Sequence, residues 1–172
     1  MRHSLSAESL SGRGERMRSD HEYRIGVTWT GNRGTGTSGY RDFARDTVIT
    51  ADGMPELLAS ADKPFHGASD RWNPELLLLA SLAQCHLLSY LYVATRAGIV
   101  VQEYADAPSA TLRTRPDGGG RIEEATLRPT VTISAGDAEV ARALHEEAGA
   151  LCFIAASVAF PIRHEPTIIV AG

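Results

Sequence analysis

Alternating apolar and polar residues predict a first strand at residues 23–29, YRIGVTW. The glycine-rich stretch at residues 30–40 predicts a turn or flexible loop, and a return strand is expected at residues 45–51. Together these segments predict a hairpin. A loop over residues 52–72 follows, with a short turn expected around residues 55–60.

The sharpest boundary in the chain is the sequence RWNPE at residues 71–75. Asn73 can cap a helix, Pro74 suits the first helical position, and Glu75 complements the positive end of the helix dipole. The sequence therefore predicts a long helix that begins at Pro74 and ends at Gly98.

This predicted helix carries the most apolar segment of the chain. The twenty residues from Leu76 to Thr95 have no formal charge, which is long enough to span a bilayer. Gln84, His86 and two serines dilute the segment, and the rest of the chain has strand patterns that need a soluble core. We therefore predict a central helix buried on every side of a soluble protein, with no membrane contact.

Residues 99–115 form a β-rich run that turns at residues 116–120 into a second run at residues 121–134. This pattern predicts a second hairpin. A helix is then expected over residues 136–152, with one apolar stripe made of Val140, Leu144 and Ala148.

A final strand pattern covers residues 157–170 and contains Pro161 and Pro166. Proline cannot donate to a ladder, so the ends of this strand should lie at sheet edges or bulges. The order of strands, long helix, strands, helix and strand is an α+β pattern.

Composition places the chain among single-domain globular proteins. The chain has 172 residues and 43% of them are hydrophobic, while 22% are charged and the net charge is −4. This balance excludes a disordered acidic segment and a broadly basic nucleic-acid binder. Residues 1–21 predict a disordered leader without a signal-peptide core, so one domain is expected over residues 22–172, in the cytoplasm.

The two cysteines are too few for a disulfide scaffold or an all-cysteine zinc site. Cys85 lies in the middle of the apolar helix, and Cys152 lies at the end of the second predicted helix. They are either unrelated buried residues or a pair. If the two helices pack with the Cα atoms within ~6 Å, a reversible disulfide can form.

Several segments resemble the osmotically inducible protein C and organic hydroperoxide resistance (OsmC/Ohr) superfamily of thiol peroxidases. The sequence NPE at residues 73–75, ten positions before Cys85, is similar to the first motif of that family, and LHEEAGALCFIAASVAFPI at residues 144–162 is similar to the second. WTGNRGTG at residues 29–36 and FHG at residues 65–67 also match. The resemblance covers the chain from about Glu22 onward and implies an OsmC-like fold. That fold has two antiparallel β-sheet regions around a long buried central helix, in an intertwined homodimer.

The resemblance implies a peroxidase that reduces organic hydroperoxides in oxidative stress defence. Cys85 would be the thiolate that attacks the peroxide and becomes a sulfenic acid, and Cys152 would condense with it to a disulfide. The family scheme needs no bound cofactor or metal. It needs an external dithiol, for which a lipoylated protein is the implied reductant.

A thiolate at Cys85 needs a nearby cation, because an apolar helix opposes its charge. The family supplies an arginine held by the NPE glutamate, here Glu75, and Arg33 in the GNRG segment is the best match. Arg71 or His66 are the alternatives. In a straight helix Glu75 lies ~15 Å from Cys85, so it can act there only if the helix bends or if a second subunit contributes it.

Two further interpretations remain open. His86 directly follows Cys85, where the best-known members carry Phe, and we interpret it as a polar neighbour that can donate a hydrogen bond.

The alternative function is an OsmC-fold protein that lacks peroxidase activity and binds a metal or small ligand. Its soft ligands would be Cys85, His86, His145 and Cys152, of which His145 and Cys152 lie seven residues apart on one helix face.

Overall fold

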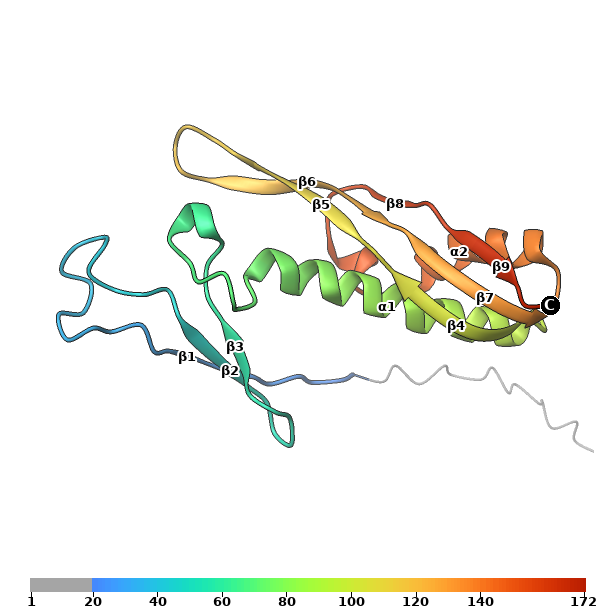
Figure 1. The fold of residues 1–172 in the computed structure, drawn as a ribbon, viewed down its shortest axis with the longest axis horizontal. Coiled ribbons are helices and arrows are strands. Elements are labelled where there is room, and N and C mark those ends of the chain that lie inside the picture. Colours follow the sequence, from blue (N-terminus) through green and yellow to red (C-terminus); the bar gives the residue numbers. More distant parts are fainter. Residues whose placement is uncertain (1–19) are drawn as a thin grey trace, which may run out of the picture.

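The structure is a computed structural model that describes residues 20–172. Its described part contains two α-helices, two short 3-10 helices and nine strands (Figure 1). Residues 1–19 of the predicted leader lie outside the described residues.

The predicted first hairpin is confirmed. Strands β1 (Gly26–Trp29) and β2 (Thr47–Thr50) pair antiparallel, and the glycine-rich stretch lies in the loop between them. The turn expected around residues 55–60 is wrong, because strand β3 (Leu57–Ala59) occupies this position and pairs with β2. A segment of three residues is too short to show the alternation of apolar and polar residues that predicts a strand. Its conformation depends on the pairing with β2. A 3-10 helix, η1 (Lys63–Phe65), follows β3.

The predicted long helix is α1 (Pro74–Arg96). The Asn73 side chain accepts a hydrogen bond from the backbone N–H of Leu76 at 2.8 Å, as an N-cap does, and Gly98 follows the helix with a φ of +72°. Among residues 20–172, α1 is the one helix long and apolar enough to cross a membrane, a test that the core helix of a soluble protein also passes.

The prediction of a helix buried on every side is wrong for the single chain. α1 buries one face, made of Leu82, His86, Tyr90, Val93 and Ala94. Its opposite face carries Leu88, Leu91 and Tyr92, which are exposed. The remaining elements of one chain are too few to enclose the helix, so an apolar face remains uncovered.

The second predicted hairpin is a long ribbon that runs alongside α1 (Figure 1). Its outgoing half consists of β4 (Val100–Asp106) and β5 (Ser109–Thr114), and its returning half of β6 (Gly120–Leu127) and β7 (Pro129–Ala135). β5 pairs with β6 next to the turn, and β4 pairs with β7 at the far end. The predicted turn over residues 116–120 is confirmed, with one residue of overlap at Gly120.

Helix α2 (Ala138–Leu151) begins after Asp137, whose side chain accepts from two backbone N–H groups, and packs on α1. The predicted apolar stripe is partly wrong. Val140 is 44% exposed, and the buried face consists of Ala141, His145 and Ala148. The polar residue His145 is therefore buried in the core, whereas the apolar pattern predicted its neighbour Leu144 there.

The final strand pattern divides into β8 (Ile162–His164) and β9 (Thr167–Val170), after a 3-10 helix, η2 (Ala155–Ser157). β8 pairs parallel with β6 and β9 pairs parallel with β7, each at the edge of a three-stranded sheet. Pro161 and Pro166 flank β8, which confirms that the prolines lie at edge positions.

The hydrophobic core lies between α1, α2 and the β4–β7–β9 sheet. It is built from Tyr90, Val93, Ala94, Ile99, Val131, Ile133, Ala141 and Ala148. The α+β fold class is therefore confirmed. The N-terminal sheet of β1, β2 and β3 lies beyond the first turn of α1, away from this core (Figure 1).

Candidate dithiol site

Cys85 and Cys152 lie in contact where α1 packs on the end of α2. The two thiols are free, and they are hydrogen-bonded to each other. Their exposure differs: Cys85 is half-buried, whereas Cys152 is only 1% exposed. Of the two alternatives that the sequence left open, the structure has the cysteines as a pair.

The local backbone explains the position of Cys152. It is the C-cap of α2, with extended backbone angles, so its side chain lies at the point where the chain leaves the helix. The backbone N–H of Ala155 donates to its Sγ at 3.3 Å. Burial, and then the hydrogen bond with Cys85, raise the pKa of Cys152 to about 11. Cys152 is therefore a protonated thiol at neutral pH.

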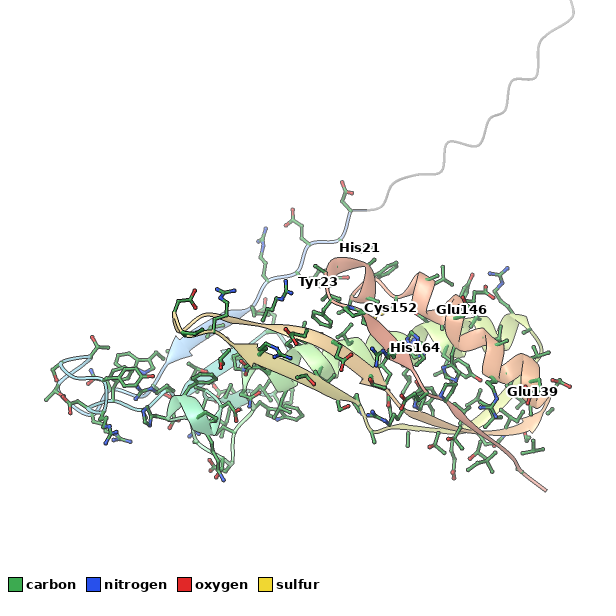
Figure 2. All side chains as sticks on the ribbon, turned by 90° about the horizontal axis from the view of Figure 1, so that it is seen from above. His21, Tyr23, Glu139, Glu146, Cys152 and His164 are labelled. Atoms are coloured by element: carbon green, nitrogen blue, oxygen red, sulfur yellow. The ribbon has the colours of Figure 1, made fainter. Side chains whose placement is uncertain are left out.

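Cys85 opens onto an apolar cavity of about 680 Å³. The walls come from α1, from the end of α2 and from the N-terminal segment before β1, and the lining residues are Tyr23, Ser81, Gln84, Cys85, Leu88, Ser89, Tyr92, Leu151, Phe153 and Ile154. Tyr23 and Cys152 are labelled in Figure 2, where the N-terminal segment passes the end of α2. Cys152 is absent from the cavity wall, so a molecule in the cavity meets Cys85 first.

Arg33 lies in a different pocket of about 310 Å³ beside the glycine-rich loop, together with Arg41, Phe43, Arg45 and His66. This pocket shares no residue with the cysteine cavity. Arg45 donates to the backbone oxygens of Tyr40 and Phe43 and stacks on both rings. Within one chain, the structure therefore does not bring Arg33 or His66 to Cys85.

The other two predicted charged residues also lie away from the cysteine cavity. Arg71 forms an ion pair with Asp46 at 3.7 Å. Glu75 lies in the first turn of α1, ten residues and ~15 Å of helix rise before Cys85, and its Oε2 is buried without a hydrogen-bond partner. Burial of a carboxylate oxygen without a hydrogen bond costs free energy, so we expect a hydrogen-bond donor to Glu75.

His86 does not face Cys85. It is buried in the core, where its Nε2 lies 3.0 Å from Nδ1 of His145, and its ring also stacks on His164. The predicted ligand set of cysteines and histidines therefore divides into a thiol pair and an imidazole pair. Within residues 20–172, no group of three or more His, Cys, Asp or Glu side chains has a geometry that holds a metal ion. The sequence analysis missed His164, because nothing local marks a residue of a short edge strand as part of a core cluster.

The α+β fold and the pair of thiols, one half-buried and one buried, define a small dithiol protein built around one long helix. The family described as OsmC-like protein matches residues 67–167, more than half of the chain. The chain belongs to this family, and the resemblance read from the sequence motifs is confirmed. No curated protein sequence matches the chain.

Solved structures carry the same fold. An OsmC-like protein of unknown function from Vibrio cholerae is 26% identical, with a TM-score of 0.73 over 86% of this chain and 99% of that chain. An organic hydroperoxide resistance protein from Legionella pneumophila is 17% identical, with a TM-score of 0.65 over 88% and 99%. The organic hydroperoxide resistance protein OhrB of Bacillus subtilis is 20% identical, with a TM-score of 0.59 over 86% and 98%. The last two likenesses concern the fold alone.

Proposed function

We propose that the protein is a thiol-dependent peroxidase that reduces organic hydroperoxides. The observation that carries the proposal is the contact between a half-buried Cys85, which lines an apolar cavity, and a buried Cys152, which does not. Two thiols in this arrangement can take up two oxidising equivalents as a disulfide. Membership of the OsmC-like family, and fold relatives named for organic hydroperoxide resistance, agree with this chemistry.

In the first step, the Cys85 thiolate attacks one oxygen of the peroxide, and the O–O bond breaks. Cys85 becomes a sulfenic acid, and the other oxygen takes a proton and leaves as an alcohol or as water. The unequal exposure of the two thiols supports this division of roles. Burial and the hydrogen bond with Cys85 raise the pKa of Cys152, which disfavours negative charge on the Cys152 sulfur and leaves Cys85 as the proposed nucleophile.

In the second step, the Cys152 sulfur attacks the sulfenic sulfur of Cys85, a disulfide forms, and water leaves. The N–H of Ala155 already points at Cys152 Sγ, so it stabilises the charge that develops there. An external dithiol then reduces the disulfide and becomes a disulfide itself, which restores both thiols. We propose a lipoylated protein as this dithiol and the cytoplasm, in oxidative stress defence, as the setting.

The cavity favours a peroxide with an apolar substituent. Its volume of about 680 Å³ lies in the range of ordinary ligand pockets, and Leu88, Leu151, Phe153 and Ile154 contribute apolar wall. Tyr23, Ser81 and Gln84 contribute polar side chains to the same wall. Hydrogen peroxide would leave most of this apolar surface uncovered, so we expect organic hydroperoxides to be the better substrates.

We propose further that the working unit is a homodimer in which each subunit completes the site of the other. Val27 on β1 is 61% exposed, and the outer face of α1 is uncovered; contiguous exposed apolar surface of this kind marks interaction sites in many proteins. Arg33, held in a pocket without Cys85, and the unpaired oxygen of Glu75 would then act from the partner subunit. This assignment accounts for the ~15 Å of helix between Glu75 and Cys85.

The test is the mass of the reduced protein after one equivalent of cumene hydroperoxide, followed by alkylation of the remaining thiols. We expect the wild type to lose two mass units and both thiols. Cys152→Ser should accumulate a sulfenic acid that a dimedone probe traps, and Cys85→Ser should not. Two thiols that remain alkylatable at micromolar peroxide would overturn the proposal.

A further inference from the structure

Three histidines that lie far apart in the sequence meet in the core: His86 on α1, His145 on α2 and His164 on β8. The ring centroids of His86 and His164 are 4.3 Å apart, and those of His86 and His145 are 5.3 Å apart. His145 also stacks on Tyr90, one turn further along α1, at 4.0 Å. These four rings, His86, His145, His164 and Tyr90, form what we term the histidine column, which crosses the interface between α1 and α2. Figure 2 labels His164 on β8 and Cys152 at the end of α2.

The centre of the histidine column is a hydrogen bond between two neutral imidazoles. Nε2 of His86 lies 3.0 Å from Nδ1 of His145, so one nitrogen donates and the other accepts. Burial, together with His164 and His145, lowers the pKa of His86 to about 3. Burial, together with His164 and Arg142, lowers the pKa of His145 to about 4. Near pH 7 both rings are therefore uncharged. One of the two facing nitrogens carries the proton of the hydrogen bond, and the other accepts it.

Both remaining ring nitrogens of the pair, Nδ1 of His86 and Nε2 of His145, are buried without a hydrogen-bond partner. The side chains themselves are only 1% and 2% exposed. An unsatisfied nitrogen in the core costs free energy, and an apolar residue would avoid that cost. The sequence nevertheless has imidazoles here, and the contact they make joins the two helices that carry the cysteines.

Helix geometry connects this hydrogen bond to the thiols. His86 follows Cys85 directly, and adjacent helical side chains point about 100° apart. With His86 directed at α2, Cys85 lies at the border of the interface and faces the cavity. On α2, His145 and Cys152 are seven residues apart and share one face. The His86–His145 hydrogen bond therefore links the rotation of α1 to its position along α2, beside the hydrogen bond from Tyr90 to the Ala141 oxygen.

We propose that the His86–His145 hydrogen bond is a positioning device that holds Cys85 and Cys152 at disulfide-forming distance and thereby sets the redox equilibrium of the pair. The proposal rests on the cysteine pairing of the proposed function. Neither histidine touches the reacting atoms. Their effect is to keep the two helices in the one register in which the thiols meet.

The test is the equilibrium of the purified full-length protein with glutathione buffers at pH 7. Protein dithiol and glutathione disulfide exchange two electrons, giving protein disulfide and two glutathione thiols. His145→Leu removes Nδ1 and leaves Nε2 of His86 without a partner, and we expect a shift of about tenfold toward the dithiol, or about 30 mV. His145→Asn places an amide atom near the Nδ1 position, and the equilibrium should return to within about threefold of the wild type.

The matched control is Tyr90→Phe. It removes the hydrogen bond from the Tyr90 hydroxyl to the Ala141 oxygen, at 3.0 Å, which also joins α1 to α2, but it keeps the ring and the imidazole pair. We expect its redox equilibrium to stay within about twofold of the wild type, although its stability falls. A shift in Tyr90→Phe as large as that in His145→Leu would overturn the proposal, because it would reflect helix packing in general.

If His145→Leu does not fold, His145→Gln replaces it. Its longer side chain moves the amide away from the Nδ1 position, so it should be more reducible than His145→Asn; equal values for the two variants would overturn the proposal. A wild-type protein that forms no disulfide in any glutathione buffer would overturn the pairing itself. A wild-type disulfide with unchanged variants would overturn the positioning role alone.

Discussion

Cys152 is hydrogen-bonded to Cys85, yet only Cys85 reaches the cavity. The two residues come from different helices and from different halves of the chain, so their contact exists only because α1 packs on α2. A buried thiol with a raised pKa lies beside a half-buried thiol that lines the cavity, so the two cysteines are not equivalent. Because of this difference, the reactivity of each cysteine can be tested separately.

The first prediction concerns alkylation. At pH 7.5, we expect iodoacetamide to modify Cys85 at least about tenfold faster than Cys152, because Cys152 is 1% exposed and its pKa is raised to about 11. Peptide mass spectrometry after short exposures measures both rates in the same sample. In urea the two rates should become similar. Faster labelling of Cys152 in the folded protein would reverse the assigned roles.

The second prediction concerns acid stability. His145 has a pKa of about 4 in the folded protein and an ordinary value near 6.5 when unfolded, so the unfolded chain binds the extra proton between these values. The free energy of unfolding should therefore be complete above pH 6.5 and fall as the pH drops toward 4. Between pH 4.5 and 6, urea unfolding of the wild type should depend on pH more steeply than that of His145→Asn, by about 1.4 kcal/mol per pH unit.

Several charged and titratable groups surround this pair of histidines. Burial, then His164 and then Arg142 lower the pKa of His145; burial also lowers the pKa of His164, and Asp106 on β4 opposes that shift. All of them are present in both proteins, but His145→Asn also removes one of the groups that lower the pKa of His86, so the difference between the two slopes contains a part from His86 besides the proton of the His145 imidazole. Parallel slopes would mean that this imidazole is protonated in the fold.

The third prediction concerns the exposed apolar face of β1. We expect the wild type to be a dimer by light scattering and Val27→Asp to be a monomer, because Val27 is 61% exposed and lines an apolar groove with Trp29 and Ile49. Thr28→Asp is the control, since adjacent strand residues face opposite sides of a sheet. A monomeric wild type at micromolar concentration contradicts the prediction.

The fourth prediction concerns the source of the arginine. A purified heterodimer of one Cys85→Ser subunit and one Arg33→Ala subunit contains one site with an intact Cys85 and an intact partner Arg33. If Arg33 acts across the interface, its peroxidase activity should be about half that of the wild-type dimer. If Arg33 acts within its own chain, the heterodimer should be no more active than the average of the two parent variants.

The fifth prediction concerns the start of α1. Asn73→Ala removes the side-chain acceptor of the Leu76 N–H and should lower the free energy of unfolding by about 1 kcal/mol. Asn73→Ser keeps a capping oxygen and should recover most of the loss. Thermal unfolding of the three proteins measures this, and equal melting temperatures would show that the cap is dispensable.

Local chemistry was sufficient to predict much of the fold. Asn73 and Pro74 mark the start of α1 because a cap and a missing N–H act within one turn. Likewise, Pro161 and Pro166 indicate edge strands because each removes a ladder donor. The strand β3 escaped prediction, since three residues carry no period and its pairing partner lies elsewhere in the chain.

The candidate site shows the same difference between features that local sequence predicts and features that depend on the folded arrangement. The sequence by itself determined the family, through motifs around Cys85 and Cys152, and therefore the candidate chemistry of two thiols. Three features depend on the folded arrangement: Cys152 is the more buried thiol, His86 turns away from Cys85 to meet His145, and Arg33 lies in a separate pocket. The physical reason is that burial, hydrogen-bond partners and helix register depend on residues distant in the chain, whereas capping, turns and motifs depend on neighbours.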